Sequence, residues 1–170
     1  MKSKKNLVFL GMMGSGKSSI GSLVAKKLRL DFIDVDKEIE KELGLTISKI
    51  FETKGEGYFR KYEEKITLKM LKLNTVVVSL GGGAFLNKII RKEILKNHIS
   101  FWLNWDTKIL VNRIKNSKKR PLAFNSTENE LIDLIKKRSN VYSKALYEIK
   151  CDNLSKNQIV KRILEIYETH

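Results

Sequence analysis

The sequence predicts an α/β fold, in which a parallel β-sheet carries helices on both of its faces. Five short segments that are rich in β-branched and aromatic residues recur along the chain, with helical patterns between them. Such an alternation predicts parallel strands joined by helical crossovers. The segments are almost continuously apolar, as expected for strands that are buried on both faces. The expected strands are Asn6–Leu10, Asp31–Val35, Thr75–Leu80, Ser100–Leu103 and Tyr147–Cys151.

The helices are predicted from apolar stripes and from their N-terminal caps. Ile20, Leu23, Val24 and Leu28 form a stripe that indicates a helix beginning near Lys17. Two later helices are expected to begin with a capping box, in which a Ser or Thr is followed three residues later by Glu or Gln. These boxes are Thr127–Glu130 and Ser155–Gln158.

Length and composition limit the class of protein. A chain of 170 residues fits a single compact domain spanning residues 1–170, and no apolar run reaches the ~20 residues of a membrane span. The single cysteine, Cys151, excludes an internal disulfide framework and fits a reducing compartment. His98 and His170 have no neighbours at zinc-ligand spacing. We therefore expect a cytoplasmic protein with no membrane partner, and expect it to act as a monomer.

The net charge of +15, from 34 basic and 19 acidic residues, raises the question of a nucleic-acid partner. Most of the basic residues are lysines, and they are scattered among Glu and Asp through every segment. A dedicated nucleic-acid surface more often combines clustered arginine with aromatic residues that stack on bases. The sequence therefore favours a generally basic surface that attracts anionic substrates, with no nucleic-acid partner.

A phosphate-binding loop is predicted between the first strand and the first helix, in the segment GMMGSGKSS. The glycines at 11, 14 and 16 allow the backbone to curl so that its N–H groups face phosphate oxygens. The helix N-terminus adds a partial positive charge. Lys17 is expected to reach the β- and γ-phosphates, and Ser18 to offer its hydroxyl to Mg²⁺. This context predicts a nucleoside triphosphate site.

The class of P-loop protein follows from what accompanies the loop. The N-K-x-D and D-x-x-G motifs of GTPases do not occur in the sequence, and the chain is short for a motor or transport ATPase. A small kinase with a second, phosphoryl-accepting substrate is therefore expected.

Two segments at strand ends are candidates for holding that acceptor. Asp34 and Asp36 lie at the end of the second strand, and a spacing of two on a strand places both carboxylates on one face. One is suited to hold Mg²⁺ through water and the other to accept a proton from the attacking hydroxyl. The glycines Gly81–Gly83 end the third strand, where a run of glycine indicates close approach of the backbone to a ligand.

Arginine is rare here, with seven residues against 27 lysines, and its planar fork suits bidentate recognition of carboxylate or phosphate. Arg60 lies three residues before Glu63, which would share its helix face and orient it. Arg120 ends the basic stretch KNSKKRPL, which we interpret as a mobile lid. Arg113 and Arg138 are the other candidates, whereas Arg29, Arg91 and Arg162 are assigned no special role.

Taken in order, these motifs resemble those of the shikimate kinases, and the resemblance covers nearly the whole chain. The GE-x-x-FR, triple-glycine and RPL elements are the more specific ones, because the phosphate loop is shared by many enzymes. The matching segments are Gly11–Ser18, Asp34 with Asp36, Phe51–Arg60, Glu63, Gly81–Gly83, Arg120–Leu122 and Arg138–Tyr142.

The resemblance implies transfer of the ATP γ-phosphoryl group to the 3-hydroxyl of shikimate, giving 3-phosphoshikimate and ADP in aromatic amino-acid biosynthesis. It implies that Asp36 contacts the accepting hydroxyl, that Arg60 and Arg138 hold the shikimate carboxylate, and that Gly81–Gly83 supply backbone contacts. It further implies a three-layer P-loop kinase fold with five parallel strands in the order 2-3-1-4-5.

The same resemblance implies roles on the nucleotide side. Ser18 and Asp34 would serve Mg²⁺, Arg120 would close over the phosphates and Arg113 would stack on adenine. The substrate-binding region would span about residues 33–62 and the lid about residues 113–125. The catalytic residues would be Lys17, Asp36 and Arg120. The ATP-binding residues would be Gly11, Gly14, Ser15, Gly16, Lys17, Ser18, Ser19, Arg113 and Arg120.

Residue chemistry without the resemblance leaves the acceptor open. Two arginines do not by themselves distinguish a carboxylate from a nucleoside monophosphate. A gluconate or nucleotide kinase is therefore the alternative, and a basic nucleic-acid-binding ATPase is a more distant one.

Overall fold

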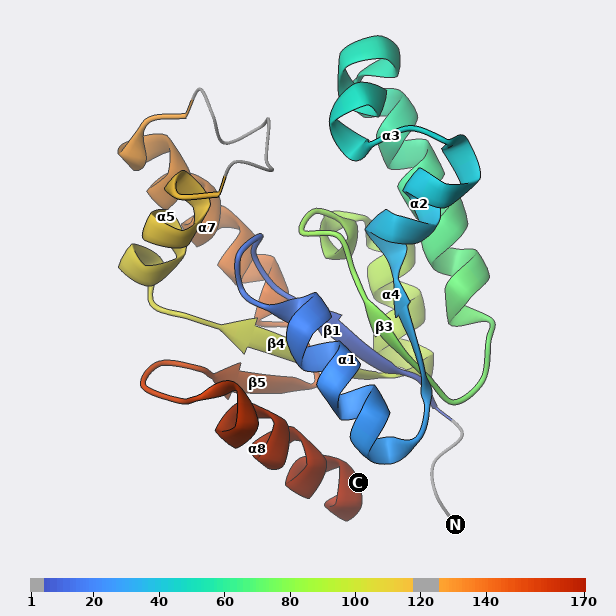
Figure 1. The fold of residues 1–170 in the computed structure, drawn as a ribbon, viewed down its shortest axis with the longest axis vertical. Coiled ribbons are helices and arrows are strands. Elements are labelled where there is room, and N and C mark those ends of the chain that lie inside the picture. The colour runs from blue at the N-terminus through green and yellow to red at the C-terminus, as the bar shows by residue number, and fades with distance from the viewer. Residues whose placement is uncertain (1–4, 118–125) are drawn as a thin grey trace.

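The structure is a computed structural model, and it describes residues 5–117 and 126–170 (Figure 1). Five strands form one parallel sheet in the order β2-β3-β1-β4-β5, which confirms the predicted fold class and strand order. Each strand lies within two residues of the expected range. The strands are β1 (Leu7–Leu10), β2 (Asp31–Asp34), β3 (Val76–Ser79), β4 (Ile99–Asn104) and β5 (Tyr147–Lys150).

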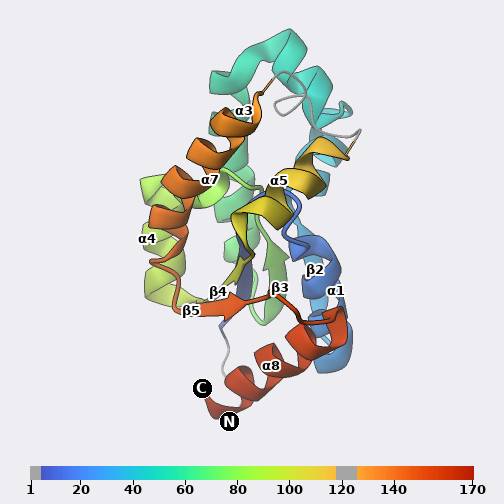
Figure 2. The same ribbon diagram turned by 90° about the vertical axis from the view of Figure 1, so that its left-hand side faces the viewer.

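The helices cover both faces of the sheet, and Figure 2 separates the two layers. One apolar cluster joins α1 (Lys17–Leu28) and α8 (Lys156–Thr169) to one face. A second cluster packs the other helices on the opposite face. These are α2 (Val35–Leu43), α3 (Ile47–Leu71), the short 3-10 helix η1 (Ala84–Leu86), α4 (Lys88–Asn97), α5 (Thr107–Lys115) and α7 (Glu128–Tyr142).

The edge strands correct one sequence-based expectation, namely that every strand is buried on both faces. The strands β1 and β3 are fully buried, whereas β2 and β5 are largely half-buried or exposed. The reason is topological, because β2 and β5 each pair with a single neighbour at the two edges of the sheet.

The predicted helix starts are confirmed by their caps. Both capping boxes form, with Thr127 opening α7 and Ser155 opening α8. The first helix begins at Lys17, directly after Gly16, whose φ of 88° is in the left-handed region. The long helix α3 is interrupted at Gly55, where φ is 81°. The helical segment that contains Glu56 and Arg60 begins directly after this break.

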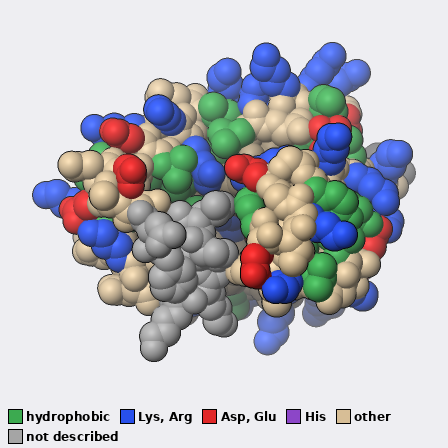
Figure 3. All heavy atoms as spheres, turned by 90° about the horizontal axis from the view of Figure 1, so that it is seen from above, with side chains coloured by type: hydrophobic (Ala, Val, Ile, Leu, Met, Phe, Trp, Pro, Cys, Tyr) green, Lys and Arg blue, Asp and Glu red, His purple; other side chains and the backbone are tan. Residues whose placement is uncertain are grey.

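No helix within the described ranges is both long and apolar enough to cross a membrane. Seen from above, the Lys and Arg side chains are spread around the visible face with Asp and Glu among them (Figure 3). This distribution matches the dispersed lysines of the sequence.

Candidate active site

A cavity of about 490 Å³ lies beyond the ends of β1, β2 and β3. It brings together nearly all of the acceptor-side candidates and part of the phosphate loop. Its polar lining includes Lys17, Ser18, Asp34, Asp36, Arg60, Glu63, Gly81, Gly82, Gly83 and Arg138. Its apolar lining includes Met13, Ile47, Phe51, Phe59 and Leu80. Parallel sheets bind ligands at this position, outside the carboxyl ends of the strands.

The phosphate loop adopts the curl that its glycines predict. Gly11, Gly14 and Gly16 have φ values of 142°, 81° and 88°, which only glycine adopts without strain. The loop closes on itself through a hydrogen bond from the Ser15 N–H to the Met12 carbonyl. Lys17 is buried, and its Nζ donates to the carbonyl oxygens of Gly11 and Met12 at 2.9 Å each. The ammonium group is thus held across the mouth of the loop.

Asp34 and Asp36 share the cavity, but not through the strand geometry that the sequence suggested. Only Asp34 lies in β2, whereas Asp36 lies in the first turn of α2. Asp34 is the N-cap of that helix, because its carboxylate accepts hydrogen bonds from the N–H groups of Asp36 and Lys37. The cap ends the strand at Asp34, so the two carboxylates are brought together by a strand-to-helix turn. The prediction that both carboxylates share one face of a strand is therefore wrong, although both residues line the cavity.

The three glycines after β3 lie close to charged side chains of the site. A Cβ atom at Gly81 would lie 2.6 Å from Glu63 Oε1 and 2.7 Å from Asp36 Oδ1. A Cβ atom at Gly82 would lie 3.5 Å from Arg138 Nη1, and one at Gly83 would overlap the Arg60 guanidinium. Gly81 and Gly83 therefore make room for charged side chains, whereas a Cβ atom at Gly82 would make ordinary van der Waals contact. The close approach of this backbone to a ligand stays a prediction.

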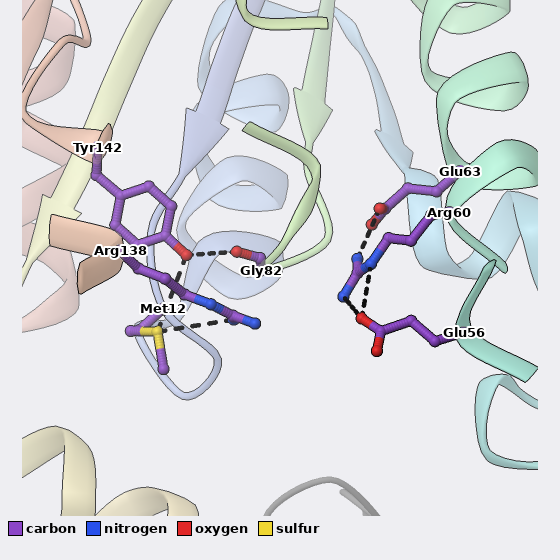
Figure 4. Close-up of polar contacts among 7 residues, drawn as sticks. All are labelled: Met12, Glu56, Arg60, Glu63, Gly82, Arg138 and Tyr142. Carbon is purple, nitrogen blue, oxygen red and sulfur yellow. Dashed lines mark hydrogen bonds and ion pairs between the residues drawn. The ribbon is translucent and has the colours of Figure 1, made fainter. Parts of the chain in front are cut away.

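Arg60 is held by two carboxylates of its own helix (Figure 4). Its Nη1 donates to Glu63 Oε2 at 2.7 Å, and its Nε and Nη2 both donate to Glu56 Oε1 at 3.2 Å. This confirms the predicted pairing with Glu63. The two carboxylates differ in burial, because the Glu63 side chain is 3% exposed and that of Glu56 is 62% exposed.

Arg138 approaches the same space from α7, opposite Arg60 (Figure 4). It is buried, and its Nη1 contacts the Met12 sulfur at 3.9 Å. Tyr142, one helical turn later, donates a hydrogen bond from its hydroxyl to the Gly82 carbonyl. Burial raises the pKa of Tyr142 to about 12, so its hydroxyl stays protonated and remains a donor. The α7 helix, the phosphate loop and the glycine segment therefore meet at Arg138.

Two buried carboxyl groups of the cavity have raised pKa values. Burial, together with the charges of Glu63 and Asp34, raises the pKa of Asp36 to about 6, and Lys17 opposes this rise. Burial also raises the pKa of Glu63, against the opposing effect of Arg60. Within the described part of the chain, Asp36 Oδ1, Glu63 Oε1 and Arg138 Nε are buried and have no hydrogen-bond partner. Buried polar atoms are normally paired, so the site is prepared for a polar ligand.

Arg113, which is predicted on the nucleotide side, does not line this cavity. Arg113 lies on α5 beside the phosphate loop, where its Nη1 donates to the Gly14 carbonyl at 3.2 Å. Arg120 and most of the predicted lid lie outside the described residues. Arg91, to which the sequence assigned no role, donates to the carbonyls of Phe85 and Leu86 and so fastens α4 to η1.

Sequence reasoning missed Met12, Met13 and Glu40 as neighbours of the site. Met13 and Glu40 line the cavity, and Met12 contacts Arg138. Both methionines occupy variable positions of the loop pattern, and Glu40 is one of many acidic residues on helix surfaces. The pattern of residues therefore carries no signal that singles them out, because their contacts arise from distant segments.

Comparison with known proteins identifies relatives over almost the entire chain. The family model described as shikimate kinase matches residues 13–168. A shikimate kinase from Caldicellulosiruptor bescii is 38% identical over 164 residues, which cover 96% of this chain and 95% of the relative. The structure of a shikimate kinase from Acinetobacter baumannii in complex with shikimate has a TM-score of 0.92 at 30% identity, covering 99% of this chain and 95% of the other. That of an Aquifex aeolicus shikimate kinase has a TM-score of 0.86 at 35% identity, with 96% coverage of both chains.

Proposed function

The chain belongs to the shikimate kinase family, and from this premise we propose that it transfers the ATP γ-phosphoryl group to the 3-hydroxyl of shikimate. The products are 3-phosphoshikimate and ADP. The observation that carries the assignment to this cavity is the set of partnerless buried polar atoms on Asp36, Glu63 and Arg138. These atoms surround a space of about 490 Å³ beside Lys17 and Ser18 of the phosphate loop.

The acceptor is held by charge and shape together. Arg60 and Arg138 face the cavity from opposite sides and supply the planar forks that suit a carboxylate. Phe51 and Phe59, whose ring centroids are 4.7 Å apart, give the same cavity an apolar wall for a carbon ring. The glycine segment contributes backbone groups at close range. A hydroxylated ring acid satisfies all three kinds of contact.

Asp36 orients the attacking hydroxyl and accepts its proton as the phosphoryl group is transferred. Its pKa of about 6 leaves it ionised at neutral pH while keeping it basic enough to accept a proton. Lys17 lowers that pKa from the phosphate side and is positioned to contact the β- and γ-phosphates. Phosphoryl transfer depends mainly on positioning and on stabilisation of charge. Asp36 supplies the positioning of the hydroxyl, and Lys17 supplies positive charge for the phosphates.

Ser18 and Asp34 form a donor set that fits Mg²⁺. Ser18 Oγ donates to Asp34 Oδ2 at 2.5 Å, so a hydroxyl and a carboxylate oxygen already lie together at the phosphate loop. The described residues hold no group of three or more His, Cys, Asp or Glu side chains suited to a metal. Mg²⁺ usually takes one or two carboxylates and leaves its other positions to water and phosphates, so the single carboxylate of Asp34 is sufficient. When bound, it would neutralise charge on the β- and γ-phosphates.

The remaining assignments are proposals that rest on the family. Residues 33–62 would bind the acceptor, and residues 113–125 would form a lid in which Arg120 closes over the phosphates. Arg113 would stack on adenine, and Gly11, Gly14, Ser15, Gly16 and Ser19 would complete the ATP site. We propose that the enzyme acts as a cytoplasmic monomer. We also propose that it has no nucleic-acid partner, which the dispersed lysines support.

An acceptor panel tests the function. Purified protein with ATP and Mg²⁺ should release ADP with shikimate and not with gluconate or a nucleoside monophosphate. Equal turnover with either of those acceptors would reject the assignment. Stimulation of ATP hydrolysis by DNA or RNA in the absence of any acceptor would instead favour a nucleic-acid-dependent ATPase.

A further inference from the structure

Trp105 connects the phosphate loop to helix α5. It follows β4 directly, and its indole Nε1 donates to the Ser15 carbonyl at 2.8 Å. The Arg113 guanidinium lies over the face of the Trp105 ring, with its Cζ 3.9 Å from the ring centroid. Arg113 in turn donates to the Gly14 carbonyl. A tryptophan and an arginine that stack on each other thus hold two successive carbonyl groups of the loop.

Other groups donate hydrogen bonds to three further carbonyls of the loop. Lys17 Nζ donates to the carbonyls of Gly11 and Met12, and the Ile20 N–H donates to the carbonyl of Gly16. A phosphate-binding loop works because its N–H groups converge on the anion, which requires the peptide planes to be turned the same way. Fixing the carbonyl end of a peptide unit also fixes the direction of the N–H in the same plane, so Trp105 fixes the N–H of Gly16. The plane that Arg113 holds carries the Ser15 N–H, which donates to the Met12 carbonyl and keeps the loop curled.

The position of Trp105 is itself rigid. Its side chain packs against the apolar clusters on both faces of the sheet. The next residue, Asp106, caps α5 through its side chain and donates its N–H to Asp152. A Cβ atom at Gly14 would lie 3.4 Å from Arg113 Cβ, so α5 packs closely on the loop.

We propose that Trp105 is a positioning residue that, through Arg113, clamps the phosphate loop in its anion-binding conformation. The proposal rests on the proposed function only in that the loop binds a polyphosphate. It differs from the role that the family resemblance gives Arg113, which is to stack on adenine. Residues that clamp the loop affect the binding of every ligand that has the phosphates. A base platform, meaning a side chain that stacks on adenine, affects only the binding of ligands that have the base.

Inorganic tripolyphosphate with Mg²⁺ separates these roles, because it has the phosphates and no base. The dissociation constants of tripolyphosphate and of ADP are measured by calorimetry for the wild type, Trp105→Phe and Arg113→Gln. Trp105→Phe keeps an aromatic face and removes the N–H donor. We expect both variants to bind both ligands about five- to tenfold more weakly, the effect of losing one hydrogen bond that fixes the site.

Lys108→Gln is the matched control for charge, since Lys108 is an exposed cation on the same helix and should leave both constants within twofold. Arg113 is exposed, so its variant tests the clamp even if Trp105→Phe folds poorly. Weakened ADP binding with unchanged tripolyphosphate binding would overturn the proposal in favour of a base platform. Unchanged binding of both ligands would also overturn it. Neither measurement involves the acceptor, so the outcome is independent of which acid is phosphorylated.

Discussion

Glu63 and Arg60 form the tightest described ion pair of the site, with 2.7 Å between Oε2 and Nη1. Glu63 is buried, and its Oε1 faces Gly81 without a hydrogen-bond partner among the described residues. Glu56 holds the same guanidinium from an exposed position. One arginine is therefore fixed by a buried carboxylate and by a solvent-screened one. Loss of the buried pair with Glu63 should therefore cost more free energy than loss of the exposed pair with Glu56.

Replacing Glu63 by Gln should raise the KM for shikimate about tenfold or more, because a buried hydrogen bond between charged groups contributes about 1.5–3 kcal/mol. The KM for ATP should change less than twofold. Glu56→Gln is the matched control and should resemble the wild type, since its carboxylate is largely exposed. Steady-state kinetics with each substrate varied would measure this. Equal effects of the two substitutions would show that burial does not decide which carboxylate orients Arg60.

Arg60→Lys and Arg138→Lys keep the positive charge and lose the planar fork. Each should weaken shikimate binding by about 1.5–3 kcal/mol, while ATP binding stays near the wild-type value. Titration calorimetry with shikimate and with ADP measures both affinities. Loss of ADP affinity with intact shikimate affinity would reverse the assignment of these arginines.

The pH dependence of kcat/KM should report Asp36. Its pKa of about 6 means that the carboxylate is mostly ionised at pH 7 and is lost to protonation as the pH falls through 6. The reaction needs the ionised form, so kcat/KM should fall about tenfold per pH unit below that point. In Asp36→Asn, kcat should be lower by about 10²–10⁴-fold, and the acidic limb should be absent. An acidic limb that persists unchanged in this variant would assign it to another group.

The same substitution should stabilise the fold. Because the pKa of Asp36 is raised from 3.8 in the unfolded chain to about 6, the folded protein binds the proton more tightly and is penalised when the carboxyl ionises. The penalty is complete above pH 6 and disappears as the pH falls towards 3.8. Asp36→Asn should therefore raise the free energy of unfolding by about 1–3 kcal/mol at pH 7 and by much less at pH 4. Denaturant unfolding at both pH values would measure this, and an equal gain at both would contradict the linkage.

Asp34→Asn should shift the Mg²⁺ requirement upward and leave the fold nearly as stable as the wild type. Asn is as good an N-cap as Asp, so α2 should keep its first turn. The lost charge weakens the set of oxygens that Asp34 forms with Ser18. Activity measured against Mg²⁺ concentration should show a higher midpoint, with kcat at saturating Mg²⁺ within about tenfold of the wild type. A normal Mg²⁺ midpoint would show that Asp34 acts only as a cap.

The fold could be predicted because its signals are local. A continuous apolar run, a glycine turn and a capping box are read within ten residues, and the five strands and both capping boxes formed as expected. The pairing of Arg60 with Glu63 was equally accessible, since Glu63 lies one helical turn away, whereas the second partner, Glu56, was not predicted. The strand order was available only through the family resemblance, because hydrogen bonds between strands join segments that are far apart in the sequence.

The sequence by itself determined the sheet, the phosphate loop and the kinds of residue at the site. Only the tertiary structure decided that Asp36 lies in a helix, that Gly81 and Gly83 make room for charged side chains, and that Trp105 donates to the Ser15 carbonyl. These contacts join residues up to 90 positions apart in the chain. Their geometry depends on how the helices pack on the sheet, and a pattern of residues in one segment contains no information about the side chains that another segment brings against it.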